Sequence, residues 1–128
     1  MRTVNKIILI GNVTKDPTIK TTENNKKIAL FTVATNRYYK TAEGEQKSES
    51  EFTSCVAWGN LAERCEQFLV KWKLVYVEWR LKTRVIEKDD WERIYRTEVV
   101  VSNLIFLNKR SDFVEKKEET DTNDSDVF

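Results

Sequence analysis

The segment ESEFTSCVAWGNLAERCEQFLVK, residues 49–71, decides the fold because a strand pattern passes directly into a helix pattern. Residues 49–58 predict a strand, in which alternate side chains face opposite sides of a sheet. Residues 59–71 then place apolar side chains at the i, i+4, i+7 and i+8 spacing of an amphipathic helix: Leu61, Cys65, Phe68 and Leu69. Asn60 and Glu63 have the spacing of a capping box at the start of that helix.

Four further runs are dense in β-branched and aromatic residues, which favour strands. Two precede the quoted segment, at 4–13 and 26–36, and two follow it, at 71–84 and 93–107, the last with a possible break at Ser102-Asn103. The predicted order is therefore β-β-β-α-β-β. Polar segments at 38–49 and 87–93 predict hairpins between the second and third strands and between the fourth and fifth. An all-β chain of five strands with one helix in this place matches the OB-fold, a small Greek-key barrel that often binds oligonucleotides.

Charge divides the chain into a basic body and an acidic end. Residues 1–110 carry 20 Lys and Arg against 14 Asp and Glu, whereas residues 111–128 carry 2 against 7. We expect one domain over 1–110 and a disordered acidic tail over 111–128, which lacks any periodic apolar pattern. A basic body suits a polyanionic partner, and an acidic tail suits a cationic one.

The residue types that the chain lacks argue against a zinc protein, a disulfide-bonded protein and an enzyme. It contains no histidine and only two cysteines, Cys55 and Cys65, so neither a zinc site nor a disulfide framework is predicted. We expect both thiols to be buried, no metal or other cofactor, and no enzyme activity, since the usual general base is missing. The apolar run near the N-terminus is shorter than a signal peptide or membrane span, which favours a cytoplasmic protein with no membrane contact.

Aromatic and basic residues alternate along the predicted strands. Phosphates need cations and unpaired bases offer faces for stacking, so this mixture is typical of single-stranded nucleic-acid binding. The alternative is that Phe52 and Trp58 belong to the core. The residues that suggest nucleic-acid binding are Arg37, Tyr38, Tyr39, Lys40, Phe52, Trp58, Arg80, Lys82 and Arg84.

Five motifs together resemble the bacterial single-stranded DNA-binding protein family over roughly the first 107 residues. They are VNKIILIGNVTKDP, ALFTVATNRYYK, EFTSCVAWGNLAERCEQFL, KLVYVEWRLKTR and YRTEVVV, and the chain also ends in DSDVF, similar to the family's acidic tip. The resemblance implies an OB-fold, usually a homotetramer, that binds single-stranded DNA without sequence preference. It also implies a nucleoid-associated role in DNA replication, recombination and repair, with partner proteins recruited through the tip.

The resemblance also implies roles for particular residues. Stacking aromatics fall on Tyr39, Phe52 and Trp58, and contacts to the DNA backbone fall on Arg2, Lys71 and Arg84. A further stacking tryptophan of the family falls on Ile86, which cannot stack comparably. The residues implied in partner binding are Asp121, Asp124, Asp126, Val127 and Phe128.

Two other kinds of binding module stay open. One is an OB-fold primosome subunit or a plasmid- or phage-encoded relative, although such proteins often lack an acidic tip. The other is a structural adaptor that uses the same barrel to bind proteins. Affinity for oligo(dT) that falls with salt separates both DNA binders from the adaptor, because only they release counterions.

Tryptophan stands at three positions where the resembled family commonly has glycine: Trp72, Trp79 and Trp91. Alternation predicts that Trp79 points toward the core with Val75 and Val77, and residue 72 follows the helix, where glycine serves as a left-handed cap. Our hypothesis is that a UGA codon read as glycine in the source is here decoded as tryptophan. The alternative is that these tryptophans are genuine and replace the stacking platform lost at Ile86.

Overall fold

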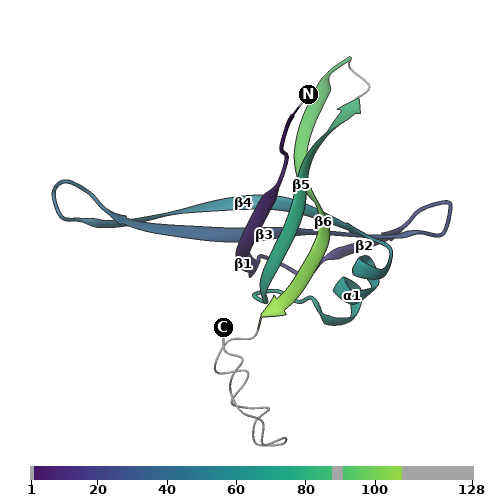
Figure 1. The fold of residues 1–128 in the computed structure, drawn as a ribbon, viewed down its shortest axis with the longest axis horizontal. Coiled ribbons are helices and arrows are strands. Elements are labelled where there is room, and N and C mark those ends of the chain that lie inside the picture. Colours follow the sequence, from purple (N-terminus) through teal and green to yellow (C-terminus); the bar gives the residue numbers. More distant parts are fainter. Residues whose placement is uncertain (1, 88–90, 108–128) are drawn as a thin grey trace, which may run out of the picture.

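The computed structural model describes residues 2–87 and 91–107, which form six strands and one helix (Figure 1). Five of the strands and the helix were predicted. The elements are β1 (Ile7–Val13), β2 (Thr18–Thr21), β3 (Lys27–Lys40), β4 (Gln46–Trp58), α1 (Asn60–Phe68), β5 (Leu74–Glu87) and β6 (Arg93–Leu107).

The strands form one sheet in the order β1-β5-β6-β4-β3-β2, and β1 also pairs with β3. This second pairing closes the sheet into a barrel, so the predicted OB-fold is confirmed. β1 pairs with β5 up to Asn12↔Leu74 and with β3 at Asn12↔Ala34 and Val13↔Val33. The short strand β2, which was not predicted, lies antiparallel to the start of β3. Its four residues are too few to show a clear period-two pattern.

The core follows from period-two alternation on the central strands. Ala29, Phe31 and Val33 point inward from β3, and Val75 and Val77 point inward from β5. Both cysteines lie in this core, as predicted. Burial raises the pKa of the Cys55 thiol to about 12 and that of the Cys65 thiol to about 11, which keeps both protonated near neutral pH.

Helix α1 packs against β3 and β4, where it buries Ala62 and Cys65. The predicted capping box is wrong. The N-cap is Gly59, with φ 64°, and no side chain caps the helix. Glu63 instead donates its backbone N–H to the Gly59 carbonyl at 3.0 Å. The helix therefore begins one residue earlier than an Asn60 cap would require, because Gly59 makes the turn out of β4.

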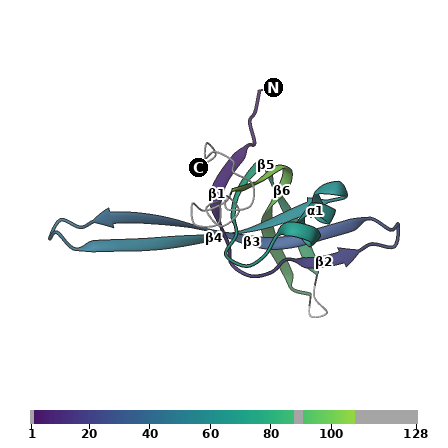
Figure 2. The ribbon, with the colours of Figure 1, turned by 90° about the horizontal axis from the view of Figure 1, so that it is seen from below.

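Two hairpins continue beyond the barrel as two-stranded arms (Figures 1 and 2). One is the outer part of β3 and β4, and the other is the outer part of β5 and β6. Their residues are mostly exposed, since no second layer covers either ribbon. The sequence predicted both hairpins but made their strands too short: the predicted strands end early at residues 36 and 84, and the strand after the first hairpin begins late at residue 49.

The predicted break at Ser102 is a β-bulge inside a continuous strand. Glu78 pairs with Asn103 and Trp79 pairs with Val101, so Ser102 is the extra residue of β6. Trp79 also pairs with Ile7 at the first residue of β1, where the barrel ends. The indole is 45% exposed, so the prediction that it joins the core is wrong. Alternation gives the face of a strand but not where the covering layer stops.

Closure of the barrel leaves no room beside Gly11. A Cβ atom there would lie 2.2 Å from the Ala34 carbonyl oxygen and 2.9 Å from Cγ1 of Val33. We predict that Gly11→Ala lowers the free energy of unfolding by about 1–3 kcal/mol or more, because backbone must shift to admit the methyl group. Urea denaturation measures this loss.

Gly44→Asn is the matched control. Gly44 has φ 86° and nothing within 4 Å of an added Cβ, and asparagine tolerates this conformation. We expect the control to change stability little. Equal losses in the two variants would contradict the close approach at Gly11.

Candidate nucleic-acid interface

Two large aromatic side chains lie on the outer face of β4. Phe52 is 66% exposed and Trp58 is 47% exposed, so the alternative that they are core residues is wrong. They are six residues apart on one strand and share a face, which puts them about 20 Å apart. Their exposed rings offer two platforms on which unpaired bases could stack.

An open groove of about 440 Å³ lies beside Phe52. Four small polar side chains line it together with the Trp72 indole. Ser50 donates to the Asn36 side-chain oxygen at 2.7 Å across the strands, which fixes one wall. The lining residues are Asn12, Thr14, Ala34, Asn36, Ser50, Phe52 and Trp72.

A second hollow, of about 170 Å³, reaches Ser54, which lies between Phe52 and Trp58 on the same face of β4. Its charged lining residues are three cations and two carboxylates: Lys15, Arg84, Arg96, Asp16 and Glu98. A strand of nucleic acid that stacks on both aromatics would cross this basic hollow. Sequence reasoning identified Arg84 but missed Lys15 and Arg96. The signal for Arg96 was the predicted hairpin itself, because strand pairing sets it directly opposite Arg84.

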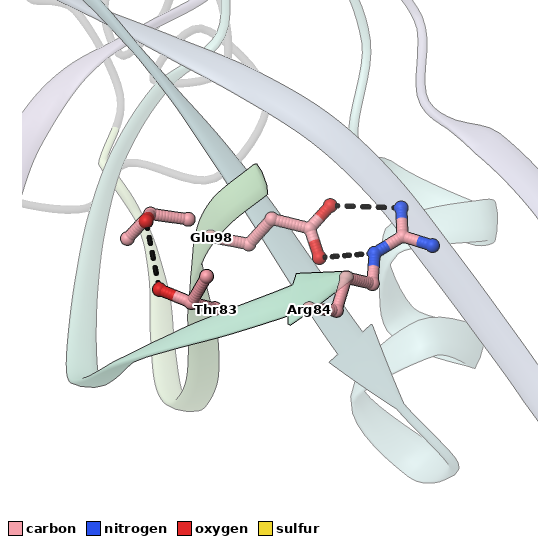
Figure 3. Close-up of polar contacts among 4 residues, drawn as sticks. Thr83, Arg84 and Glu98 are labelled. Atoms are coloured by element: carbon pink, nitrogen blue, oxygen red, sulfur yellow. Dashed lines mark hydrogen bonds and ion pairs between the residues drawn. The ribbon is translucent and has the colours of Figure 1, made fainter. Parts of the chain in front are cut away.

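Arg84 is held by a carboxylate at the edge of this hollow (Figure 3). Its Nε donates to Oε1 of Glu98 at 2.9 Å, and its terminal nitrogen donates to Oε2 at 3.2 Å. Glu98 is only 8% exposed, whereas the Arg84 side chain is half exposed. The bidentate pair fixes the guanidinium in place. It also removes part of the positive charge that Arg84 would offer a phosphate.

The β3–β4 arm carries four of the predicted residues. Tyr38 and Lys40 are exposed, and Tyr39 is half-buried. Arg37 donates to Glu49 at 3.1 Å and lies 4.8 Å from the centre of the Tyr39 ring. The structure therefore brings these residues together on one arm, with Arg37 already engaged by a carboxylate and an aromatic ring.

The other predicted residues are more dispersed. Arg2 precedes β1 and is exposed, and Lys82 is exposed on the β5–β6 arm. The Lys71 ammonium lies 4.9 Å from the centre of the Trp72 ring. The five residues implied in partner binding, and the acidic tail, lie outside the described residues.

Two further kinds of site receive no support from residues 2–87 and 91–107. Within these ranges, no three Asp, Glu, Cys or His side chains gather as metal ligands would. The described part of the chain also has no helix with the length and apolar character needed to cross a membrane.

Comparison with known proteins gives the same family at the levels of sequence and structure. The chain is 39% identical to single-stranded DNA-binding protein 3 of Listeria innocua and 40% identical to a single-stranded DNA-binding protein of Bacillus cereus. Each match covers 84% of this chain but only 66% and 62% of those relatives. A solved structure described as a Plasmodium falciparum SSB complex with ssDNA superposes with a TM-score of 0.76 at 33% identity, over 84% of this chain and 98% of that one.

A family model gives the most direct assignment. The model of the Single-strand binding protein family matches residues 4–107, which contain every strand and the helix. The chain therefore belongs to the single-strand binding protein family.

Proposed function

We propose that this protein binds single-stranded DNA without sequence preference and is not an enzyme. The observation that carries the proposal is the outer face of β4, where exposed Phe52 and Trp58 flank a hollow lined by Lys15, Arg84 and Arg96. Stacking accepts any base because every base has a flat face, and cations accept any phosphate. Binding by stacking and by phosphate contacts therefore does not require any residue to recognise a particular base. The names of the relatives and of the superposed complex support the same ligand.

Phe52→Ala and Trp58→Ala should each weaken binding to oligo(dT) by about 1–3 kcal/mol, because each removes one stacking platform. The dependence of affinity on salt should change little, since no charge is removed. Fluorescence anisotropy of labelled oligo(dT) at several salt concentrations measures both quantities. Loss of folded structure in both variants, seen by circular dichroism, would favour a structural role for the two rings instead.

Basic variants provide the matched comparison. Arg96 takes part in no ion pair among the described residues, so Arg96→Ala should lower the salt slope by about one. Arg84→Ala should also lower the slope, but it leaves the Glu98 carboxylate beside the DNA path. The double variant Arg84→Ala/Glu98→Gln should therefore bind more tightly than Arg84→Ala alone. An adaptor that binds only proteins would show no salt-dependent affinity for oligo(dT) in any variant.

The proposed assembly is a homotetramer in the cytoplasm, associated with the nucleoid. An apolar row crosses β1, β5 and β6, in which Ile10 pairs with Tyr76 and Tyr76 pairs with Ile105. Ile8, Ile10 and Ile105 are all exposed in the single chain. Apolar surface of this kind is usually covered by another protein, and a second copy of the same chain would cover it in a symmetric contact.

Ile10→Lys should reduce the assembly to smaller species, because it places a charge in this apolar row. Light scattering coupled to gel filtration measures the mass in solution. Val85→Lys is the control, since Val85 is also an exposed aliphatic residue of the sheet but lies on the β5–β6 arm. A tetramer that persists in Ile10→Lys would contradict this interface.

The tail proposal rests on sequence. Asp121, Asp124 and Asp126 stand beside an apolar Val127-Phe128 end, which offers a basic pocket on a partner both charge and an anchor. We propose that this tip recruits proteins of DNA replication, recombination and repair. A tail that only aids solubility is the alternative.

Deletion of residues 121–128 should leave oligo(dT) affinity equal or slightly higher at low salt and abolish partner binding. Pull-down of replication and repair proteins from an extract of the source cells measures the second effect. Phe128→Ala is the sharper variant, because it keeps every tail charge and removes only the anchor. Intact partner binding with reduced solubility after the deletion would favour the solubility role.

A further inference from the structure

Two tryptophans have a backbone conformation that ordinarily belongs to glycine. Five described residues have positive φ: Gly44, Gly59, Asn25, Trp72 and Trp91. Glycine adopts this region without cost, and asparagine visits it because its short side chain can hydrogen-bond locally. For a bulky side chain it is an outlier. Two of the four tryptophans in the chain are such outliers, with φ 74° at Trp72 and φ 68° at Trp91.

The neighbours of residue 72 hold its backbone in this conformation. Lys73 donates its N–H to the Val70 carbonyl at 3.1 Å, which makes Trp72 the third residue of a turn. Positive φ at the third residue alone is the pattern of a type II turn, whose third residue is usually glycine. Helix α1 ends in an extended residue, Leu69, so the predicted left-handed helix cap is corrected to a left-handed turn.

Both peptide groups of residue 72 are also tied to β1. The Trp72 N–H donates to the Val13 carbonyl at 2.7 Å, and the Asn12 side-chain amide donates to the Trp72 carbonyl at 3.0 Å. Rotation to negative φ would break these bonds at the point where the barrel closes. The turn therefore imposes the conformation whatever side chain residue 72 carries.

The indoles gain little packing in return. Trp72 is 61% exposed and Trp91 is 95% exposed. Trp79 is not left-handed, but it lies beside the bulge at Ser102, and an interior strand glycine often marks a bulge. The composition points the same way. The chain has 3 glycines among 128 residues, where average usage would give roughly nine.

We propose that residues 72, 79 and 91 are glycine positions, and that tryptophan stands there because UGA codons read as glycine in the source are translated as tryptophan. If the groove beside Phe52 binds DNA, as proposed above, glycine at position 72 would also change that groove. Glycine at 72 would remove one wall of the groove beside Phe52. It would also release the Lys71 ammonium, which now lies over the indole, for a phosphate.

Peptide mass spectrometry of the protein isolated from its source cells tests the assignment directly. Trypsin should release residues 74–80 and 89–93, and cleavage after glutamate should release residues 67–78, which contain position 72. We expect the mass of glycine at all three positions. Tryptophan at any of the three positions would overturn the proposal there, and this readout does not depend on DNA binding.

Variants of the tryptophan form provide a second test. Trp72→Gly should raise the folding equilibrium constant roughly 5- to 30-fold, because relief of left-handed strain is worth one or two kcal/mol. Trp72→Ala should gain less, since alanine is also strained at positive φ. Trp58→Gly is the control and should lose stability, because residue 58 lies in a strand and not among the left-handed residues.

Oligo(dT) affinity separates this proposal from a stacking role for the indole. Trp72→Gly should bind as tightly as the parent or more tightly. If Trp72→Gly lowered the affinity for oligo(dT) threefold or more, and Phe52→Ala also lowered it, Trp72 would be a genuine stacking platform. That result would overturn the proposal. If neither Phe52→Ala nor Trp72→Gly changed the affinity, the proposed DNA site would fail, while the mass and stability results would still decide the glycine assignment.

Discussion

Closure of the barrel at Gly11 and Asn12 is the constraint on which the rest of the molecule depends. β1 leaves β5 and joins β3 within these residues, and the Ala34 carbonyl lies where a Cβ of residue 11 would be. The same crossing positions Asn12, whose side chain holds the turn after α1 through the residue 72 carbonyl. A sheet that failed to close here would lose its continuous core and the wall of the groove beside Phe52.

The binding surface is a product of this closure together with strand register. Phe52 and Trp58 share the outer face of β4 because they are separated by an even number of residues, and side chains alternate between the two faces of a strand. The basic hollow between them draws Lys15 from before β2, Arg84 from β5 and Arg96 from β6. Stacking sites and cations are thus supplied by different strands, so a one-residue slip in β5 or β6 would turn the cations to the opposite face.

Local patterns were sufficient to predict most elements of the fold. Alternation around Phe31 and Val77 gave the strands and their inner faces, and the apolar stripe of residues 61–69 gave the helix. A break was predicted at Ser102-Asn103, but its nature as a β-bulge could not be, because only the pairing of β5 with β6 shows which residue is the extra one. Lys15 and Arg96 were missed for a related reason. They are far apart in sequence, and only the paired strands bring them to one hollow.

The two-stranded arms have a consequence for the thermodynamics of association. A hairpin that packs against nothing is marginally stable in water, so each arm opens at a much lower free energy than the barrel that supports it. A ligand lying along an arm must suppress that opening, which lowers its net affinity below what the contacts alone would give. The same effect couples the two ends of an arm. A ligand that orders one end of the ribbon reduces the conformational entropy that is still lost when a ligand binds at the other end.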